Sequence, residues 1–209
     1  LYTKWKTNEY QIKYNANGGT GTMANQIYKY GETKALSKNA FTNIGKVFMG
    51  WATSSDGKVT YQDSQSIGNL SDVDGTIINL YAVWEPLKYE VKYNSTCTIA
   101  NTTHTYDEDK ALPNHTCNKE GHIFKGWSLT ENGEVKYKNG QTVKNLTTNS
   151  SVVNLYAVWE AHTYEVKFNA NGASGTMQNQ SYKYGEAKEL SENKFTKEGS
   201  EFKGWALTS

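Results

Sequence analysis

The sequence predicts a β-rich protein of the α+β class, in which small domains follow one another in tandem. First, several motifs occur three times in the same order along the 209 residues, and such recurrence is the signature of a repeat architecture. Second, the recurring segments alternate apolar and polar residues, as β-strands with one buried face do. Third, 13% of the residues are aromatic and the formal net charge is only +1, a composition typical of folded chains and not of disordered ones.

Three motifs mark the repeats. The segment Tyr-Gln-Ile-Lys-Tyr-Asn at 10–15 returns in similar form at 89–94 and 164–169, Gly-Trp at 50–51 returns at 126–127 and 204–205, and Leu-Tyr-Ala-Val-Trp-Glu at 80–85 returns at 155–160. The opening residues look like a further copy of that closing segment. We therefore expect the closing strand of a preceding repeat at 1–6, a first repeat at 7–85, a second at 86–160 and an incomplete third at 161–209. Units of this length have room for one small core each, so we expect an elongated array of separate domains.

The first half of a repeat opens with a strand. Residues 9–14 alternate apolar and polar side chains, which predicts a half-buried strand. The Asn- and Gly-rich stretch at 15–19 predicts a turn, and residues 26–30 predict a second strand that a glycine ends. Residues 32–39 carry Ala and Leu at weak helical spacing, which indicates a short helix or an extended crossing.

The second half of a repeat completes the sheet. Residues 47–51 predict a third strand, in which Gly50 suggests a close approach of another backbone segment. Residues 77–84 have apolar side chains on both faces, which favours a central strand. Each unit is thus expected to be a small mixed sheet with at most one short helix.

Composition and motifs argue against several functional classes. All 22 basic residues are lysines, whereas paired readout of guanine and phosphate favours arginine. The chain contains no apolar run of about 18 residues, the length that spans a membrane, and no recognised nucleophile, phosphate-binding or metalloprotease motif. We therefore expect no enzymatic activity, no cofactor, no metal site and no nucleic-acid partner.

The 6 tryptophans occupy only two positions of the repeat. Exposed tryptophans could be stacking platforms for sugars, but these lie inside apolar strands at the same phase each time, which favours a core role. The expected core tryptophans are Trp51, Trp84, Trp127, Trp159 and Trp205.

Only the second repeat contains cysteines, Cys97 and Cys117. It also lacks the methionine and the phenylalanine that the first repeat carries near the matching positions, Met23 and Phe41. We expect a disulfide to replace this apolar plug, and closing a loop of this length stabilises a fold by about 3 kcal/mol in the chain-entropy description. An even number of cysteines suits a secreted protein.

A zinc site is the alternative for the same two cysteines. Three of the four histidines lie in this repeat: His104, His115 and His122. The spacing contains neither of the close cysteine or histidine pairs of structural zinc sites, so the disulfide is favoured.

The ordered motifs resemble those of a known family. They are Tyr-x-Val-x-Phe-Asn-Ala-Asn-Gly at 164–172, Gly-Thr-Met at 21–23, Tyr-Gly at 30–31, Phe-Thr through Gly-Trp at 41–51, and Leu-Tyr-Ala-Val-Trp at 80–84. Together they resemble the Listeria–Bacteroides repeat, also called the internalin B-repeat. The resemblance implies a β-grasp, ubiquitin-like fold and a place in secreted or wall-attached bacterial proteins, where such repeats are stalks or spacers. It implies no catalytic residues.

These expectations lead to one favoured function and two alternatives. The favoured function is a non-catalytic extracellular stalk, spacer or adhesion module of a bacterial cell-surface protein. In the first alternative, lysine-bearing strand faces contact a host glycan or protein, for example at Lys88, Lys92, Lys136 and Lys138. In the second, residues 1–6 of one chain complete residues 161–209 of another by strand addition, which gives head-to-tail self-association.

Overall fold

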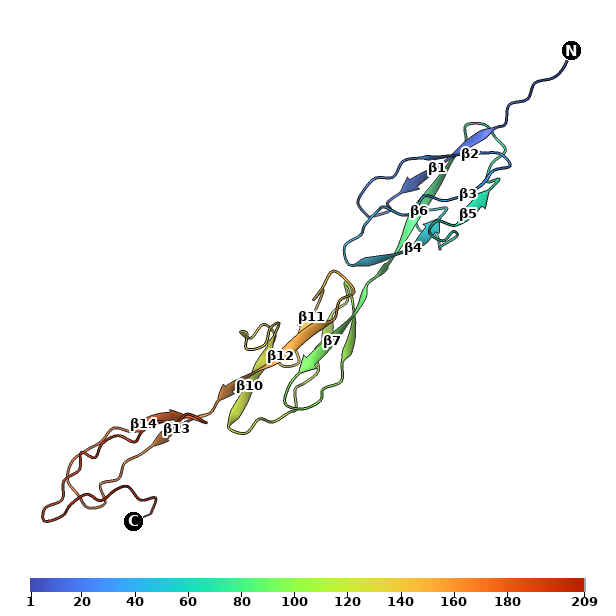
Figure 1. Ribbon diagram of the computed structural model, residues 1–209. Coiled ribbons are helices and arrows are strands. Elements are labelled where there is room, and N and C mark those ends of the chain that lie inside the picture. Colours follow the sequence, from blue (N-terminus) through green and yellow to red (C-terminus); the bar gives the residue numbers. More distant parts are fainter. Residues whose placement is uncertain (209) are drawn as a thin grey trace. The chain divides into compact units, whose positions relative to one another are not determined.

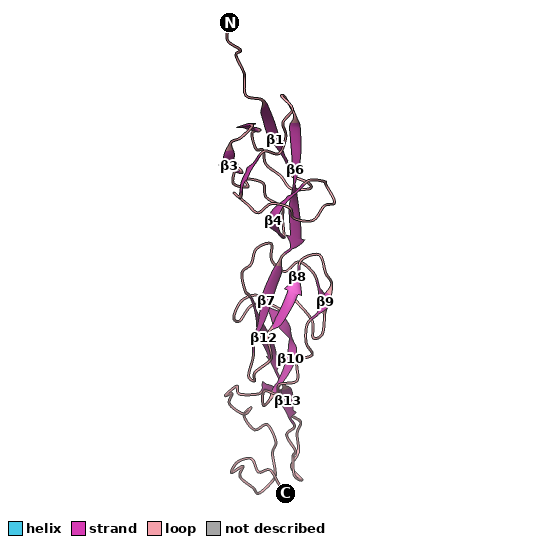
Figure 2. Cartoon of the chain, turned by 90° about the vertical axis from the view of Figure 1, so that its right-hand side faces the viewer, coloured by secondary structure: helices cyan, strands magenta, loops and turns pink. Residues whose placement is uncertain are grey.

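A computed structural model describes residues 1–208 of the chain, and within them all regular structure is β (Figures 1 and 2). Of the two conformations expected for residues 32–39, a short helix or an extended crossing, the helix does not form, and no helix among the described residues supports the helical part of the α+β assignment. Instead β3 (Thr33–Ala35) pairs with β5 (Ser66–Gly68). The Leu36 N–H donates to the Gln65 carbonyl at 3.0 Å, so partners remote in sequence take up the backbone groups that a helix would have used. Across residues 1–208 no helix is long and apolar enough to cross a membrane.

The described chain forms two compact units that do not coincide with the sequence repeats. The first unit comprises residues 1–92, 101–111 and 142–153, and the second comprises 93–100, 112–141 and 154–209. The first repeat therefore lies wholly in the first unit and the third repeat in the second, whereas the second repeat contributes to both.

The first repeat contains a four-stranded mixed sheet. Its strands lie in the order β2 (Gln26–Lys29), β1 (Glu9–Asn15), β6 (Ile77–Pro86), β4 (Lys46–Ala52). β1 runs parallel to β6 and antiparallel to β2, and β4 runs antiparallel to β6. The central position of β6 agrees with its apolar residues on both faces.

A β-bulge in β4 explains the glycine of the recurring Gly-Trp motif. The register of β4 against β6 shifts between Phe48 and Gly50, and Gly50 has φ +143°, in the region that favours glycine. A Cβ at Gly50 would approach the Tyr61 carbonyl oxygen to 2.7 Å. The close approach lets the Trp51 N–H donate to that same carbonyl at 2.8 Å.

The second repeat contains the same sheet order. Its strands are β10 (His122–Ser128), β12 (Val153–Ala161), β7 (Lys88–Asn94) and β8 (Thr102–Thr105). The bulge recurs between Phe124 and Gly126, and a second small sheet pairs β9 (Lys110–Ala111) with β11 (Thr142–Val143). In the third repeat β13 (Thr163–Val166) pairs with β14 (Gln180–Lys183).

The core of the first repeat lies on one face of its sheet. Tyr10, Ile12 and Tyr14 all point into it from β1, as the alternation along residues 9–14 predicts. Tyr28 stacks on Tyr10 with ring centroids 5.4 Å apart. The core closes around Trp51, which Tyr14 contacts at 4.8 Å between ring centroids.

The tryptophans divide by burial. Trp51 and Trp127 are fully buried at 0% exposure, whereas three others are partly buried: Trp84, Trp159 and Trp205. The Trp84 Nε1–H donates to the Ala16 carbonyl at 2.9 Å. Trp5 is 90% exposed, so it does not belong to a core in this structure.

Candidate functional site

Three residues that distinguish the second repeat from the other two, Cys97, Cys117 and His115, gather in one cluster. Cys97 and Cys117 form a disulfide with their Cα atoms 5.7 Å apart. It ties the turn after β7 to the segment that precedes β10. Cys117 is buried and Cys97 is exposed. Because the two sulfurs are bonded to each other, neither can be a thiolate ligand of zinc, and residues 1–208 bring no three metal-ligating side chains together.

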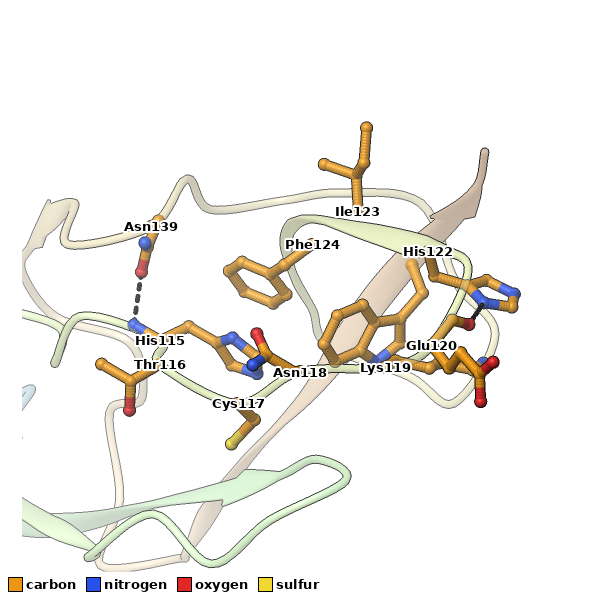
Figure 3. Close-up of a pocket in the computed structure, with 11 residues that line it drawn as sticks. His115, Thr116, Cys117, Asn118, Lys119, Glu120, His122, Ile123, Phe124 and Asn139 are labelled. Atoms are coloured by element: carbon orange, nitrogen blue, oxygen red, sulfur yellow. Dashed lines mark hydrogen bonds between the residues drawn. The ribbon is translucent and has the colours of Figure 1, made fainter. Parts of the chain in front are cut away.

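His115 is packed as an aromatic core residue (Figure 3). Its ring stacks on Phe124 at 3.8 Å between centroids and 7° between planes. Its ring also meets Trp127 and Trp159 edge-on, at 5.4 and 5.1 Å. The ring nitrogen Nε2 lies 2.7 Å from the Ser95 hydroxyl, which satisfies this buried polar atom.

The other repeats show what the disulfide and His115 replace. In the first repeat Phe41 meets Trp51 edge-on at 6.2 Å, and the Met23 sulfur accepts the Ala40 N–H at 3.5 Å. The third repeat has both contacts as well. Phe195 meets Trp205 edge-on at 6.1 Å, and the Met177 sulfur accepts the Lys194 N–H at 3.5 Å. In the second repeat a ring from a different position, His115, supplies the aromatic contact, and the disulfide supplies the link that methionine makes elsewhere.

The sequence did not indicate this role for His115. It suggested His115 only as a zinc ligand, because two cysteines and three histidines are near one another in the chain. The missing phenylalanine was the available signal, since a core that has lost a ring at one position needs another ring to fill the space.

His104 is a second buried histidine, and it replaces a tyrosine. Its ring stacks on Tyr89 at 5.7 Å and 23°, where the first repeat stacks Tyr28 on Tyr10 and the third stacks Tyr182 on Tyr164. The Thr102 hydroxyl lies 3.0 Å from His104 Nε2. His122, by contrast, lies at the rim of the cluster with Nδ1 2.7 Å from the Glu120 carbonyl oxygen (Figure 3).

Burial lowers the pKa of both His104 and His115, and the nearby Lys110 charge lowers the pKa of His104 further. Both rings are therefore neutral at pH 7 in the folded state. In the unfolded chain each would titrate near its ordinary pKa of about 6.5, so the unfolded state binds more protons below that pH.

We therefore expect the second repeat to lose stability as the pH falls through and below about 6.5. Each pKa unit of depression corresponds to about 1.4 kcal/mol. Amide hydrogen exchange measured repeat by repeat between pH 7.5 and 5 will detect the loss, after correction for the intrinsic pH dependence of exchange. His104→Tyr, which restores the residue found in the first repeat, is expected to reduce the pH dependence. An equal response of the first and second repeats would contradict the expectation.

A shallow hollow of about 460 Å³ opens beside the cluster. Phe124 and Cys117 contribute to its wall, and Lys119 and Glu120 contribute charge (Figure 3). Trp159 also lines the hollow. The first repeat has a smaller hollow of about 330 Å³ near Trp84, lined by different, mostly polar residues. Within this cluster the two cysteine sulfurs are bonded to each other, and the His115 imidazole packs against the rings of Phe124, Trp127 and Trp159.

Comparison with known proteins agrees with the repeat pattern. The family model for the Listeria–Bacteroides repeat domain matches residues 10–83, 89–158 and 164–209. A relative from Evansella cellulosilytica named "Putative Gly-rich membrane protein" is 28% identical over 217 aligned residues, which cover 98% of this chain and 23% of the relative. A second protein of that organism, named "Putative membrane protein", is 28% identical over 183 residues, covering 83% of this chain and 24% of the relative.

The chain thus spans about a quarter of the length of these relatives. The family match, in contrast, is present three times in succession and takes in nearly the whole chain. It coincides with the recurring strand order, bulge and tryptophan positions. The resemblance seen in the sequence is therefore confirmed, and the chain belongs to the Listeria–Bacteroides repeat domain family.

Proposed function

We propose that this chain is a non-catalytic extracellular spacer, part of the stalk of a bacterial cell-surface protein. One observation carries the proposal: the residues that recur between repeats are used for the fold itself. Trp51 and Trp127 are fully buried, and the glycine before each forms the bulge in its strand. A binding function repeated along the chain would instead need recurring residues on the surface.

We further propose that each repeat has a β-grasp-like sheet without the helix. The parallel pairing of the first and last strands, β1 and β6, at the centre of a mixed sheet supports this topology. The extended crossing that contains β3 and Leu36, with Leu36 buried in the core, takes the place of the helix.

Two observations support an extracellular location. The relatives from Evansella cellulosilytica carry names that describe membrane proteins. The disulfide between Cys97 and Cys117 suits an oxidising compartment outside the cytosol.

Small-angle X-ray scattering tests the spacer role. A spacer built from successive domains should give a scattering profile of an extended particle at all protein concentrations. A profile that fits a globule of the same mass would contradict the proposal.

A glycan- or protein-binding role is the alternative. Lys88 and Lys92 are exposed on β7, but Glu90 lies between them on the same face of the strand, so the face is of mixed charge. A glycan array probed at low salt distinguishes the two roles, because acidic-glycan binding through lysines would be strongest there. Head-to-tail self-association through residues 1–6 also stays a prediction, for which native mass spectrometry with and without those residues is the test.

A further inference from the structure

The first and second repeats meet at a tyrosine that lies on a glycine. The Tyr106 ring covers Gly45 so closely that a Cβ built on this glycine would fall among the ring carbons. The backbone follows the same path: the Leu87 N–H donates to the Gly45 carbonyl at 2.9 Å, and the Tyr106 N–H donates to the Leu87 carbonyl at 2.8 Å. All three residues belong to one compact unit.

The second and third repeats meet in the same way. The Tyr184 ring lies where a Cβ on Gly121 would be. The His162 N–H donates to the Gly121 carbonyl at 2.8 Å, and the Tyr184 N–H donates to the His162 carbonyl at 2.8 Å. These residues also share one compact unit, so the two junctions are independent observations of one geometry.

Side chains next to Gly121 add to the second junction. The His122 ring meets Tyr184 edge-on at 5.8 Å. The nearby Glu120 carboxylate raises the pKa of Tyr184. The Tyr184 ring thus contacts both Gly121 and His122.

The junctions need glycine for two separate reasons. Gly45 and Gly121 have φ values of +67° and +65°, in the left-handed region where a side chain is strained. Any side chain would also displace the tyrosine ring. Gly199, at the matching position of the third repeat, has φ +66° and no atom within 4 Å of a Cβ. A side chain at Gly199 would therefore strain the backbone but would displace no ring.

The tyrosine half of the junction also occurs alone. Tyr30 holds the matching position in the first repeat, and its N–H donates to the Asn8 carbonyl at 2.9 Å, as Tyr106 does to Leu87. Tyr30 is 51% exposed, Tyr184 is 41% exposed and Tyr106 is partly buried. The glycine turn at Gly199 and the tyrosine turn at Tyr30 thus keep the backbone geometry of the docked junctions although neither is docked. Such preformed geometry lowers the cost of docking.

We propose that the glycine turn before β4 and before β10 is a docking site for the tyrosine of the following repeat, and that this contact couples successive repeats. The site recognises the flat phenol ring of this tyrosine. The backbone N–H of the same tyrosine donates to the carbonyl of the residue that joins the two repeats, Leu87 or His162. The coupling is the nearest-neighbour interface term of repeat-protein stability. The contact is a property of the junction whether or not the protein serves as a spacer.

Nuclear magnetic resonance of the full chain tests the docking directly. Ring currents are expected to shift the Hα resonances of Gly45 and Gly121 upfield relative to those of Gly199. Tyr106→Ala should remove the Gly45 shift and speed hydrogen exchange of the Leu87 amide about tenfold, the effect of losing a modest local contact. Tyr106→Phe, which keeps the ring, should retain both properties.

The chain supplies matched controls. Tyr30→Ala removes the same residue from the same motif where no glycine faces it, and should leave the Gly45 and Leu87 signals unchanged. Tyr184→Ala should have an intermediate effect on the His162 amide, because Tyr184 is the more exposed of the two docked rings. If Tyr106→Ala alters Gly45 and Leu87 no more than Tyr30→Ala does, the proposal is overturned.

A second pair of variants covers the case in which Tyr106→Ala unfolds the second repeat. Gly45→Ala acts from the first repeat, and Gly199→Ala carries the same backbone strain with no ring to displace. Gly45→Ala should release the Tyr106 ring and speed exchange at Leu87, while Gly199→Ala should affect only the third repeat. Retention of the Tyr106 ring resonances and of Leu87 protection in Gly45→Ala would overturn the proposal.

Discussion

Trp127→Ala is expected to destabilise the second repeat by about 3–5 kcal/mol, the range measured for removing large buried aromatic side chains. Trp127 is fully buried, and its ring contacts those of Tyr93, His115 and Phe124. Alanine would leave a cavity bounded by three other rings, which the surrounding sheet cannot fill. Since a small domain has only a few kcal/mol of stability to lose, this repeat should unfold near room temperature.

Hydrogen exchange resolved by repeat measures the effect. The amides of β10 and β12 should lose protection, while those of β1 and β6 in the first repeat should keep it. Trp5→Ala is the control, because Trp5 is 90% exposed and its removal should change stability by less than about 0.5 kcal/mol. Protection of β12 equal to that of the unaltered protein would show that Trp127 is not a core residue in solution.

Removing the disulfide is expected to cost the second repeat about 3 kcal/mol, as the chain-entropy description gives for a loop of this size. Cys97 and Cys117 are separated by 20 residues in sequence, and their bond replaces the methionine contact of the other repeats. The variant Cys97→Ser with Cys117→Ser should therefore shift thermal unfolding of this repeat to lower temperature. Differential scanning calorimetry measures the shift.

Reduction of the unaltered protein gives an independent measurement. A phosphine reductant should lower the unfolding temperature of the second repeat to that of the double serine variant, and should leave that variant unchanged. The first and third repeats contain no cysteine and are the internal reference. Free thiols at both positions in the untreated protein, detected by mass spectrometry, would contradict the disulfide itself.

Local alternation of apolar and polar residues allowed strands to be predicted. Segments whose conformation depends on pairing with residues remote in sequence could not be predicted in this way. Residues 9–14 have period-two alternation, and their apolar members Tyr10, Ile12 and Tyr14 are buried. Residues 32–39 lack a clear period. Their conformation depends on pairing with β5, about thirty residues farther along the chain, which the local pattern does not encode.

Of the candidate site, only the disulfide bond could be predicted from the sequence. Two cysteines in a chain of this kind have one natural pairing, and the disulfide between Cys97 and Cys117 is present. The position of His115 could not be derived, because its ring reaches the core from two residues before the phenylalanine position. Its stacking on Phe124 is a solution to packing in three dimensions, to which the spacing of residues gives no guide.

The parallel pairing of β1 with β6 determines how a repeat would carry tension. The chain enters the first repeat at the start of β1 and leaves it at the end of β6, and the two strands run side by side in the same direction. A pull on both ends of the repeat therefore slides the two strands past each other and loads the hydrogen bonds between them together. Only Leu87 separates β6 from β7, so the load passes from one sheet to the next with almost no slack.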